Sequence, residues 1–180
     1  MPAKQKQACP QIYGWIMAGE RPQDYFAEVD KEVFHSGSRS CRFFSTDPKA
    51  KSWGTFMQQM APKQYVGKRL RMTFWMKTQD LKQAQGWMRV DGPKGSRSLS
   101  FENMCNRPVR GETDWAKYSI VLDVPEESTN IAFGVMIFGT GTVWLDDFAF
   151  EVVDLSVPVT ECQCSPGGGA RNLNFEEDEE

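Results

Sequence analysis

The sequence predicts an all-β domain, a sandwich of antiparallel strands, and three observations carry this prediction. No long run of the 180 residues places apolar side chains at helical spacing. Short segments of alternating apolar and polar residues recur instead, and turn residues separate them. Hydrophobic residues make up 40% of the chain and aromatic residues 12%, so one domain of this length can bury a substantial core.

The predicted strands follow one another at the spacing of a sandwich or barrel. They are expected over residues 25–29, 38–45, 53–60, 68–78, 86–91, 98–103, 115–123, 130–138 and 142–153. The turns between them contain combinations such as Asp91-Gly92-Pro93 and Gly139-Thr140-Gly141. One helical turn or short helix is expected near residues 61–65 or 81–85.

The last predicted strand contains two adjacent carboxylates, Asp146 and Asp147. Neighbouring side chains on a strand point to opposite faces, so these carboxylates are not expected to act as a pair on one substrate. We interpret the segment as a signature of the fold, in which Trp144 and Phe148 anchor the sandwich.

The charge distribution gives little support for nucleic-acid binding, because the net charge is −3. Residues 63–110 contain 11 basic and 3 acidic side chains, whereas residues 111–170 contain 1 and 10. Either the basic region docks an acidic segment, or the charges pair between neighbouring strands. No stretch has the length of a membrane-spanning helix, and the first residues lack the apolar run of a secretory signal, which predicts a cytoplasmic protein.

The cysteines give little evidence for a disulfide framework and are consistent with a reducing compartment, because their number is odd and their spacing irregular. They are Cys9, Cys41, Cys105, Cys162 and Cys164. The last two form a Cys-x-Cys pair, but with a single histidine in the chain few ligands remain for zinc. We therefore predict neither a metal site nor a cofactor.

The chain shows no catalytic constellation. Its one histidine, His35, stands beside Ser36 in an expected turn, and no Gly-x-Ser-x-Gly motif is present. The glycines at 167–169 precede no Lys-Ser/Thr pair, so they are not a phosphate-binding loop. A non-catalytic protein is expected, and an enzyme that uses His35 is the remote alternative.

Several predicted strands have an aliphatic face and a second face that mixes aromatic, charged and small residues. The aliphatic face is expected to form the core, and the mixed face is typical of the floor of a ligand groove. Packing is the competing explanation for each tryptophan on it. The candidate ligand-binding residues are Trp75, Trp87, Arg89, Asp91, Asn103, Met136 and Phe138.

A series of short motifs occurs in a characteristic order. It includes Gly14-Trp15, the segments 53–59, 65–71 and 87–92, Thr113-Asp114-Trp115, and the segment 139–151. In order and spacing these motifs resemble the galactose-binding-like jelly-roll domains of the carbohydrate-binding-module type, in a bacterial stand-alone variant. The resemblance runs from about residue 14 to residue 154. It implies a jelly-roll β-sandwich of two antiparallel sheets with a binding role, but it does not identify the ligand.

The resemblance implies two kinds of ligand. One is a glycan, with Trp75 or Trp87 stacking on a sugar ring and Arg89, Asp91 or Asn103 reaching its hydroxyls. The other is an extended peptide or partner protein, bound in the same groove or along a sheet edge. The missing export signal argues against a glycan, and the basic region suits an acidic peptide. We slightly favour the peptide, because of the expected open sheet edge and the acidic tail.

The domain is expected to span residues 14–160, between an N-terminal segment of 1–13 and a Gly/Pro linker with an acidic tail at 161–180. Domains of this kind open with a strand resembling Asn-Leu-x-Phe-Glu, which residues 4–13 lack. The tail contains such a segment in Asn172, Leu173, Asn174, Phe175 and Glu176. It is either a dangling remnant, or it docks on its own domain or on a neighbouring one in a homodimer.

Overall fold

The structure, a computed structural model, describes residues 12–96 and 98–160. These residues form nine strands and one 3-10 turn, which confirms the prediction of an all-β fold. In order they are β1 (Ile16–Gly19), η1 (Pro22–Asp24), β2 (Tyr25–Asp30), β3 (Ser40–Ser45), β4 (Trp53–Met60), β5 (Lys68–Asp91), β6 (Ser98–Glu102), β7 (Val109–Val124), β8 (Asn130–Phe138) and β9 (Thr142–Val153).

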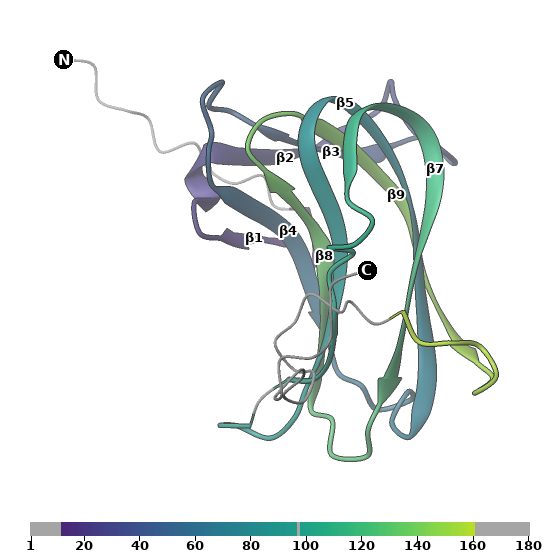
Figure 1. Ribbon diagram of the computed structural model, residues 1–180. Coiled ribbons are helices and arrows are strands. Elements are labelled where there is room, and N and C mark those ends of the chain that lie inside the picture. Colours follow the sequence, from purple (N-terminus) through teal and green to yellow (C-terminus); the bar gives the residue numbers. More distant parts are fainter. Residues whose placement is uncertain (1–11, 97, 161–180) are drawn as a thin grey trace, which may run out of the picture.

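The strands are arranged as a sandwich of two antiparallel layers (Figure 1). The first layer contains β2, β3, β9, the first half of β5 and β7. The second layer contains β1, β4, β8, the second half of β5 and β6. Because β5 belongs to both layers, hydrogen bonds link all nine described strands into one continuous sheet.

Strand β5 passes from one layer to the other between Met76 and Ala84. Its register against β7 shifts three times over this stretch, and Asp80 has a positive φ of 49°. The two strands predicted at 68–78 and 86–91 are therefore one strand of 24 residues, and the helical turn considered at 81–85 is wrong. Leu81 and Ala84 are buried, so the intervening segment also contributes to the core.

The main core lies between the layers, and two glycines show how closely they pack. A Cβ atom on Gly86 would lie 2.3 Å from Cζ of Phe74, although both residues belong to β5. A Cβ atom on Gly54 of β4 would lie 2.4 Å from Cδ2 of Tyr25 on β2. Side chains larger than hydrogen would collide with an aromatic ring at both places, so these glycines permit the close approach.

Other boundaries agree with the sequence prediction to different degrees. The strands predicted at 53–60, 130–138 and 142–153 are confirmed, whereas β7 is longer than predicted and β1 was not predicted. Residues 61–65 form coil and turn, and the 3-10 turn lies at Pro22–Asp24 instead. None of the helical structure in the described ranges is long and apolar enough to cross a membrane.

Some predictions concern residues outside the described ranges. These include the Cys162–Cys164 pair and docking by Asn172, Leu173, Asn174 and Phe175. The boundaries of the predicted domain, 14–160, remain a prediction.

Candidate functional site

The outer face of the second layer carries most of the candidate ligand-binding residues. Along β5, Met88 and Val90 point into the core between the layers. Alternation therefore places Trp87, Arg89 and Asp91 on the opposite side. Here Trp87 belongs to a second apolar cluster, separate from the main core.

The neighbouring strands extend this face. Met136 and Phe138 of β8 pair in register with Thr55 and Trp53 of β4. Met136, Phe138 and Trp53 belong to the same apolar cluster as Trp87. The structure thus brings together the predicted residues of β5 and β8, and it adds Trp53.

Trp87 forms the floor of this face rather than an exposed platform. Its side chain is 6% exposed, and its Nε1 donates a hydrogen bond of 2.8 Å to Oγ1 of Thr55. Thr55 in turn donates to the carbonyl oxygen of Val135 at 3.0 Å. This buried pair of hydrogen bonds fixes the plane of the indole.

Partly exposed aromatic side chains surround this floor. Trp53 and Phe138 lie side by side with ring centroids 6.3 Å apart, and both are only partly buried. Phe101 of β6 lies opposite Arg89 in register. Trp53 was not predicted as a site residue, although residues 53, 55 and 57 alternate along one face of the predicted strand.

A polar network lies beside Phe101, which pairs with Arg89 in register. Arg89 donates to both carboxylate oxygens of Asp91, from Nε at 2.7 Å and from Nη2 at 3.2 Å. Asn130 Nδ2 donates to the same carboxylate at 2.9 Å. Partial burial acts to raise the pKa of Asp91, but the hydrogen bonds from Arg89 and Asn130 outweigh it and hold the pKa below its ordinary value. The carboxylate is therefore ionised and oriented at neutral pH.

Asn103 directly follows β6, and its Oδ1 accepts a hydrogen bond from the backbone N–H of Cys105 at 3.2 Å. Cys105 is disulfide-bonded, which the number and spacing of the cysteines did not predict. Cys41 is a free thiol.

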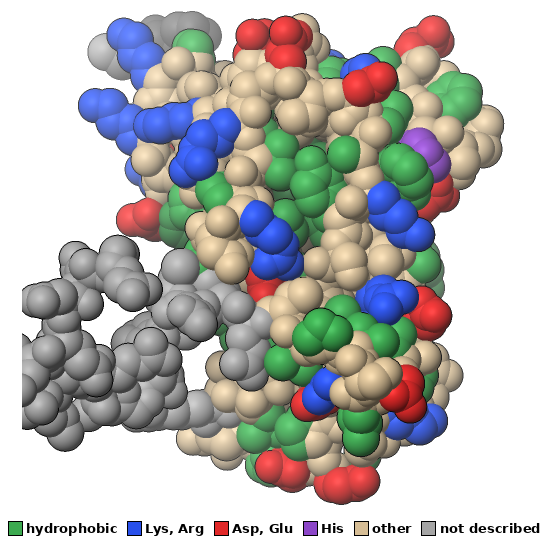
Figure 2. All heavy atoms as spheres, turned by 45° about the vertical axis from the view of Figure 1, so that its right-hand side comes forward, with side chains coloured by type: hydrophobic (Ala, Val, Ile, Leu, Met, Phe, Trp, Pro, Cys, Tyr) green, Lys and Arg blue, Asp and Glu red, His purple; other side chains and the backbone are tan. Residues whose placement is uncertain are grey.

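Trp75 is separated from the other candidate residues, because it lies on the half of β5 that belongs to the first layer. The His35 ring stacks on it, with centroids 3.8 Å apart and an interplanar angle of 18°. Trp115 approaches the same imidazole edge-on at 5.7 Å. In Figure 2 the histidine lies next to hydrophobic and acidic side chains.

Asp146 and Asp147 do not point to opposite faces, and that expectation is wrong. The register between β5 and β9 shifts by one residue here, and Asp147 has a φ of 51°. This β-bulge breaks the alternation and turns both carboxylates toward one loop. Asp146 Oδ2 accepts from the backbone N–H groups of His35 and Ser36, at 2.9 and 3.2 Å.

Asp147 binds the side chains of the same two residues. Its Oδ2 lies 2.7 Å from His35 Nδ1, and its Oδ1 accepts from the Ser36 hydroxyl at 2.8 Å. Hydrogen bonds from His35 and then Ser36 hold the pKa of Asp147 below its ordinary value. Because the hydroxyl of Ser36 is directed at the carboxylate and not at the imidazole, the cluster lacks the contact that activates a serine nucleophile.

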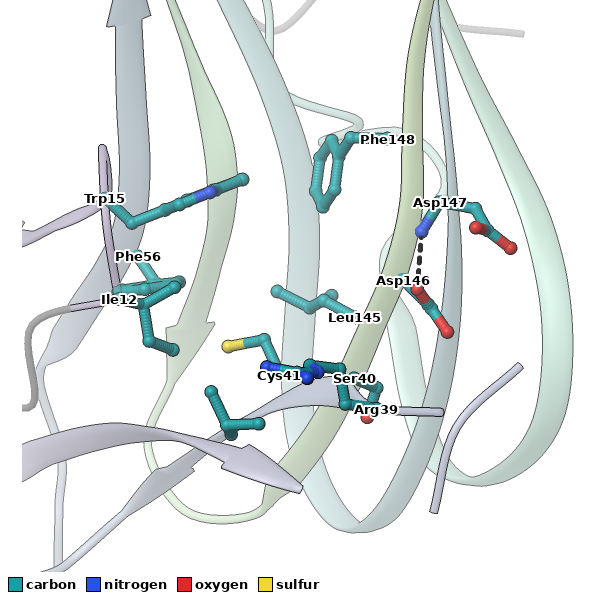
Figure 3. A pocket seen from close by; sticks show the side chains of 11 residues that line it. Ile12, Trp15, Arg39, Ser40, Cys41, Phe56, Leu145, Asp146, Asp147 and Phe148 are labelled. Atoms are coloured by element: carbon teal, nitrogen blue, oxygen red, sulfur yellow. Dashed lines mark hydrogen bonds between the residues drawn. The ribbon is translucent and has the colours of Figure 1, made fainter. Parts of the chain in front are cut away.

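A cavity of about 300 Å³ lies on the other side of this bulge (Figure 3). Its apolar wall is formed by Ile12, Trp15, Val29, Phe56, Leu145 and Phe148. Arg39, Ser40, Cys41, Asp146 and Asp147 complete the lining. The described residues contain no group of three or more His, Cys, Asp or Glu side chains that could hold a metal ion.

No model of a known protein family matches the sequence. The chain is 42% identical over 170 residues to an uncharacterised HTH-type transcriptional regulator of Bacillus subtilis, YbfP. The match covers 92% of this chain and 57% of the regulator. The chain therefore spans little more than half the length of this relative.

Solved structures confirm the resemblance to jelly-roll carbohydrate-binding modules. The CBM22-1 and GH10 modules of Clostridium thermocellum xylanase 10B, complexed with xylohexaose, give a TM-score of 0.61 at 13% identity over 77% of this chain and 26% of that one. The CBM22-1 xylan-binding domain of Paenibacillus barcinonensis Xyn10C gives 0.54 at 14% identity over 78% and 86%. At these identities the likeness shows the fold alone.

Proposed function

We propose that the protein is a non-catalytic binding domain that recognises a carbohydrate on the outer face of the second layer. The observation that carries the proposal is the combination, on one face, of partly exposed aromatic rings with an oriented guanidinium–carboxylate pair. The fold shared with carbohydrate-binding modules supports a glycan over the peptide ligand slightly favoured from the sequence.

Each part of the face matches a part of a sugar. Trp53 and Phe138 offer apolar ring surface on which the C–H face of a pyranose can stack. Arg89 and Asp91 offer paired donors and acceptors for neighbouring hydroxyls, and their side chains are 42% and 27% exposed. Trp87 serves as the rigid floor between these two parts.

The likeness to a transcriptional regulator supports a second, compatible role. A glycan-binding domain that forms part of a regulator would act as its sensor, so that sugar binding changes DNA affinity. If an oligosaccharide binds to this domain, adding it to YbfP should change the affinity of that regulator for DNA, measured by fluorescence anisotropy. An unchanged affinity would contradict the sensor role but not the carbohydrate-binding role.

Calorimetry on the full chain tests the carbohydrate site, with xylohexaose as the first probe in a panel of soluble oligosaccharides. We expect Trp53→Ala to weaken binding about tenfold, because a stacked ring is lost. Arg89→Met should weaken binding while leaving the aromatic surface in place. Trp75→Ala is the matched control, because it removes a partly buried tryptophan from the other layer.

Two results would contradict the proposal. Loss of binding in Trp75→Ala but not in Trp53→Ala would move the site to the first layer. Binding of an acidic peptide, with no response to any oligosaccharide, would favour a peptide ligand instead. Circular dichroism of each variant shows whether the fold is retained.

A further inference from the structure

We propose that the cavity beside the β9 bulge is a second binding site, and that it takes a small apolar molecule carrying one carboxylate group. The site is independent of the proposed carbohydrate face, because none of its lining residues belongs to the apolar cluster around Trp87.

The interior of the cavity suits an apolar body. Trp15 and Phe148 meet edge to face with centroids 5.1 Å apart, and Trp15 also stacks on Phe56 at 5.0 Å. Leu145 closes the wall on the side of β9. A volume of about 300 Å³ lies at the lower end of the range for small-molecule pockets, so the occupant is small.

The polar group in the apolar part of the lining, the Cys41 thiol, carries no charge at neutral pH. Burial raises the pKa of this thiol to about 12. The thiol therefore behaves as a small apolar side chain rather than as a nucleophile. A charged group of a ligand would find no opposite charge in this interior, so we expect it to lie at the rim.

The charged groups at the rim differ in what they have left to offer. All four carboxylate oxygens of Asp146 and Asp147 already accept hydrogen bonds, from the His35–Ser36 segment or from the backbone N–H of Asp147. Figure 3 shows the Asp147 side chain directed away from Trp15, Phe56 and Cys41. The two acids are thus engaged in holding the loop.

Arg39 is the rim group with unused hydrogen-bonding capacity. Its side chain is exposed, and within residues 12–96 and 98–160 it has no ion pair or hydrogen bond. A guanidinium presents a planar fork that matches a carboxylate. An apolar cavity with a free guanidinium at its rim selects a ligand with an apolar body and one carboxylate.

Three probes with the same aromatic body and different head groups test the site: phenylacetate, 2-phenylethanol and 2-phenylethylamine. Each is titrated into the full-length, 15N-labelled protein, and binding is followed by the indole N–H signal of Trp15. Arg39→Gln removes the selecting charge from an exposed position. Arg110→Gln, at an exposed position of β7 that does not line the cavity, is the matched control.

We expect phenylacetate to bind about tenfold more tightly than 2-phenylethanol, with 2-phenylethylamine weakest, because a charge-assisted hydrogen bond is lost without the carboxylate. Arg39→Gln should abolish this preference, and Arg110→Gln should keep it. Equal or tighter binding of the alcohol or the amine would overturn the proposal. So would the absence of any shift at Trp15, or an equal effect of the two arginine variants.

Discussion

At the scale of single residues, Asp146 and Asp147 are an exception to the alternation of side chains along a strand. Strict alternation separates neighbouring side chains, but one extra residue in β9 turns both carboxylates toward His35 and Ser36. The bulge requires a positive φ at residue 147, and aspartate adopts this conformation more readily than most residues. The carboxylates therefore hold the loop between β2 and β3 against the sheet.

The Asp147 contacts predict a pH dependence of stability. Because the folded pKa of Asp147 lies below the unfolded value of about 3.9, this carboxylate stabilises the fold above about pH 4. The contribution is lost as the pH falls through the lower, folded pKa. Since the side chain is 39% exposed, we expect less than about 1 kcal/mol. Asp147→Asn, which keeps a residue that tolerates positive φ, should be destabilised at pH 5 in urea unfolding, and its difference from the wild type should shrink as the pH falls through the folded pKa.

The carboxyl 13C signal of Asp147 gives a direct check. In His35→Ala its pKa should move upward, because the first of its two side-chain hydrogen bonds is gone. An unchanged titration would show that the Ser36 hydroxyl alone holds the pKa down.

At the scale of elements, β5 determines how the fold is assembled and where the candidate residues lie. It supplies Phe74 to the core from its first half and Gly86 from its second half, and these residues touch across the sandwich. It also divides the predicted site, because Trp75 projects from the first layer and Trp87 from the second. A single strand thus contributes residues to two different outer surfaces.

The contact within β5 predicts the effect of one methyl group. Gly86→Ala should destabilise the protein by about 1–3 kcal/mol, since its Cβ would lie 2.3 Å from Cζ of Phe74. Free energies of unfolding in urea for the wild type, Gly86→Ala, Phe74→Leu and the double variant form a double-mutant cycle. The second change removes the tip of the ring, so the double variant should lose less stability than the sum of the single variants. Simple additivity would show that Phe74 is not what excludes the methyl group.

The sequence predicts most strands and much of the candidate face, because both depend on local alternation. The segments 53–60 and 130–138 were predicted with the bounds they have in the structure, and dividing residues 131–138 between two faces identified Met136 and Phe138. The continuity of β5 could not be predicted, since polar residues between 77 and 85 break its apolar pattern. The stacking of His35 on Trp75 depends on which loop folds over which sheet, and no local pattern carries that information.

At the scale of the whole molecule, the two layers form one structural unit. Beyond the core between them, β5 connects their hydrogen-bond networks directly. Neither layer can open without disturbing a strand of the other. The candidate carbohydrate face and the apolar cavity are therefore parts of one structural unit: the face lies on the outer side of the second layer, and the cavity is lined by Phe56 of the second layer and by Leu145 of the first.

This connection predicts a single cooperative unfolding transition. Native-state hydrogen exchange should give the same opening free energy for the most protected amides of β8, in the second layer, and of β9, in the first. A lower value for one of the two strands, with a smaller dependence on denaturant, would show that its layer opens separately.

The position of β5 in the chain also has a consequence for biosynthesis. Its partners β6, β7, β8 and β9 all come later in the sequence. Strands β3 and β4 likewise each have one partner that is synthesised later, β9 for β3 and β8 for β4. As the polypeptide leaves the ribosome, the apolar side chains of β5 emerge before any strand that pairs with them. The sandwich can close only when β9, which ends at Val153, has been synthesised. Until then the nascent chain exposes unpaired strand edges, the condition in which chaperones protect a growing protein from aggregation.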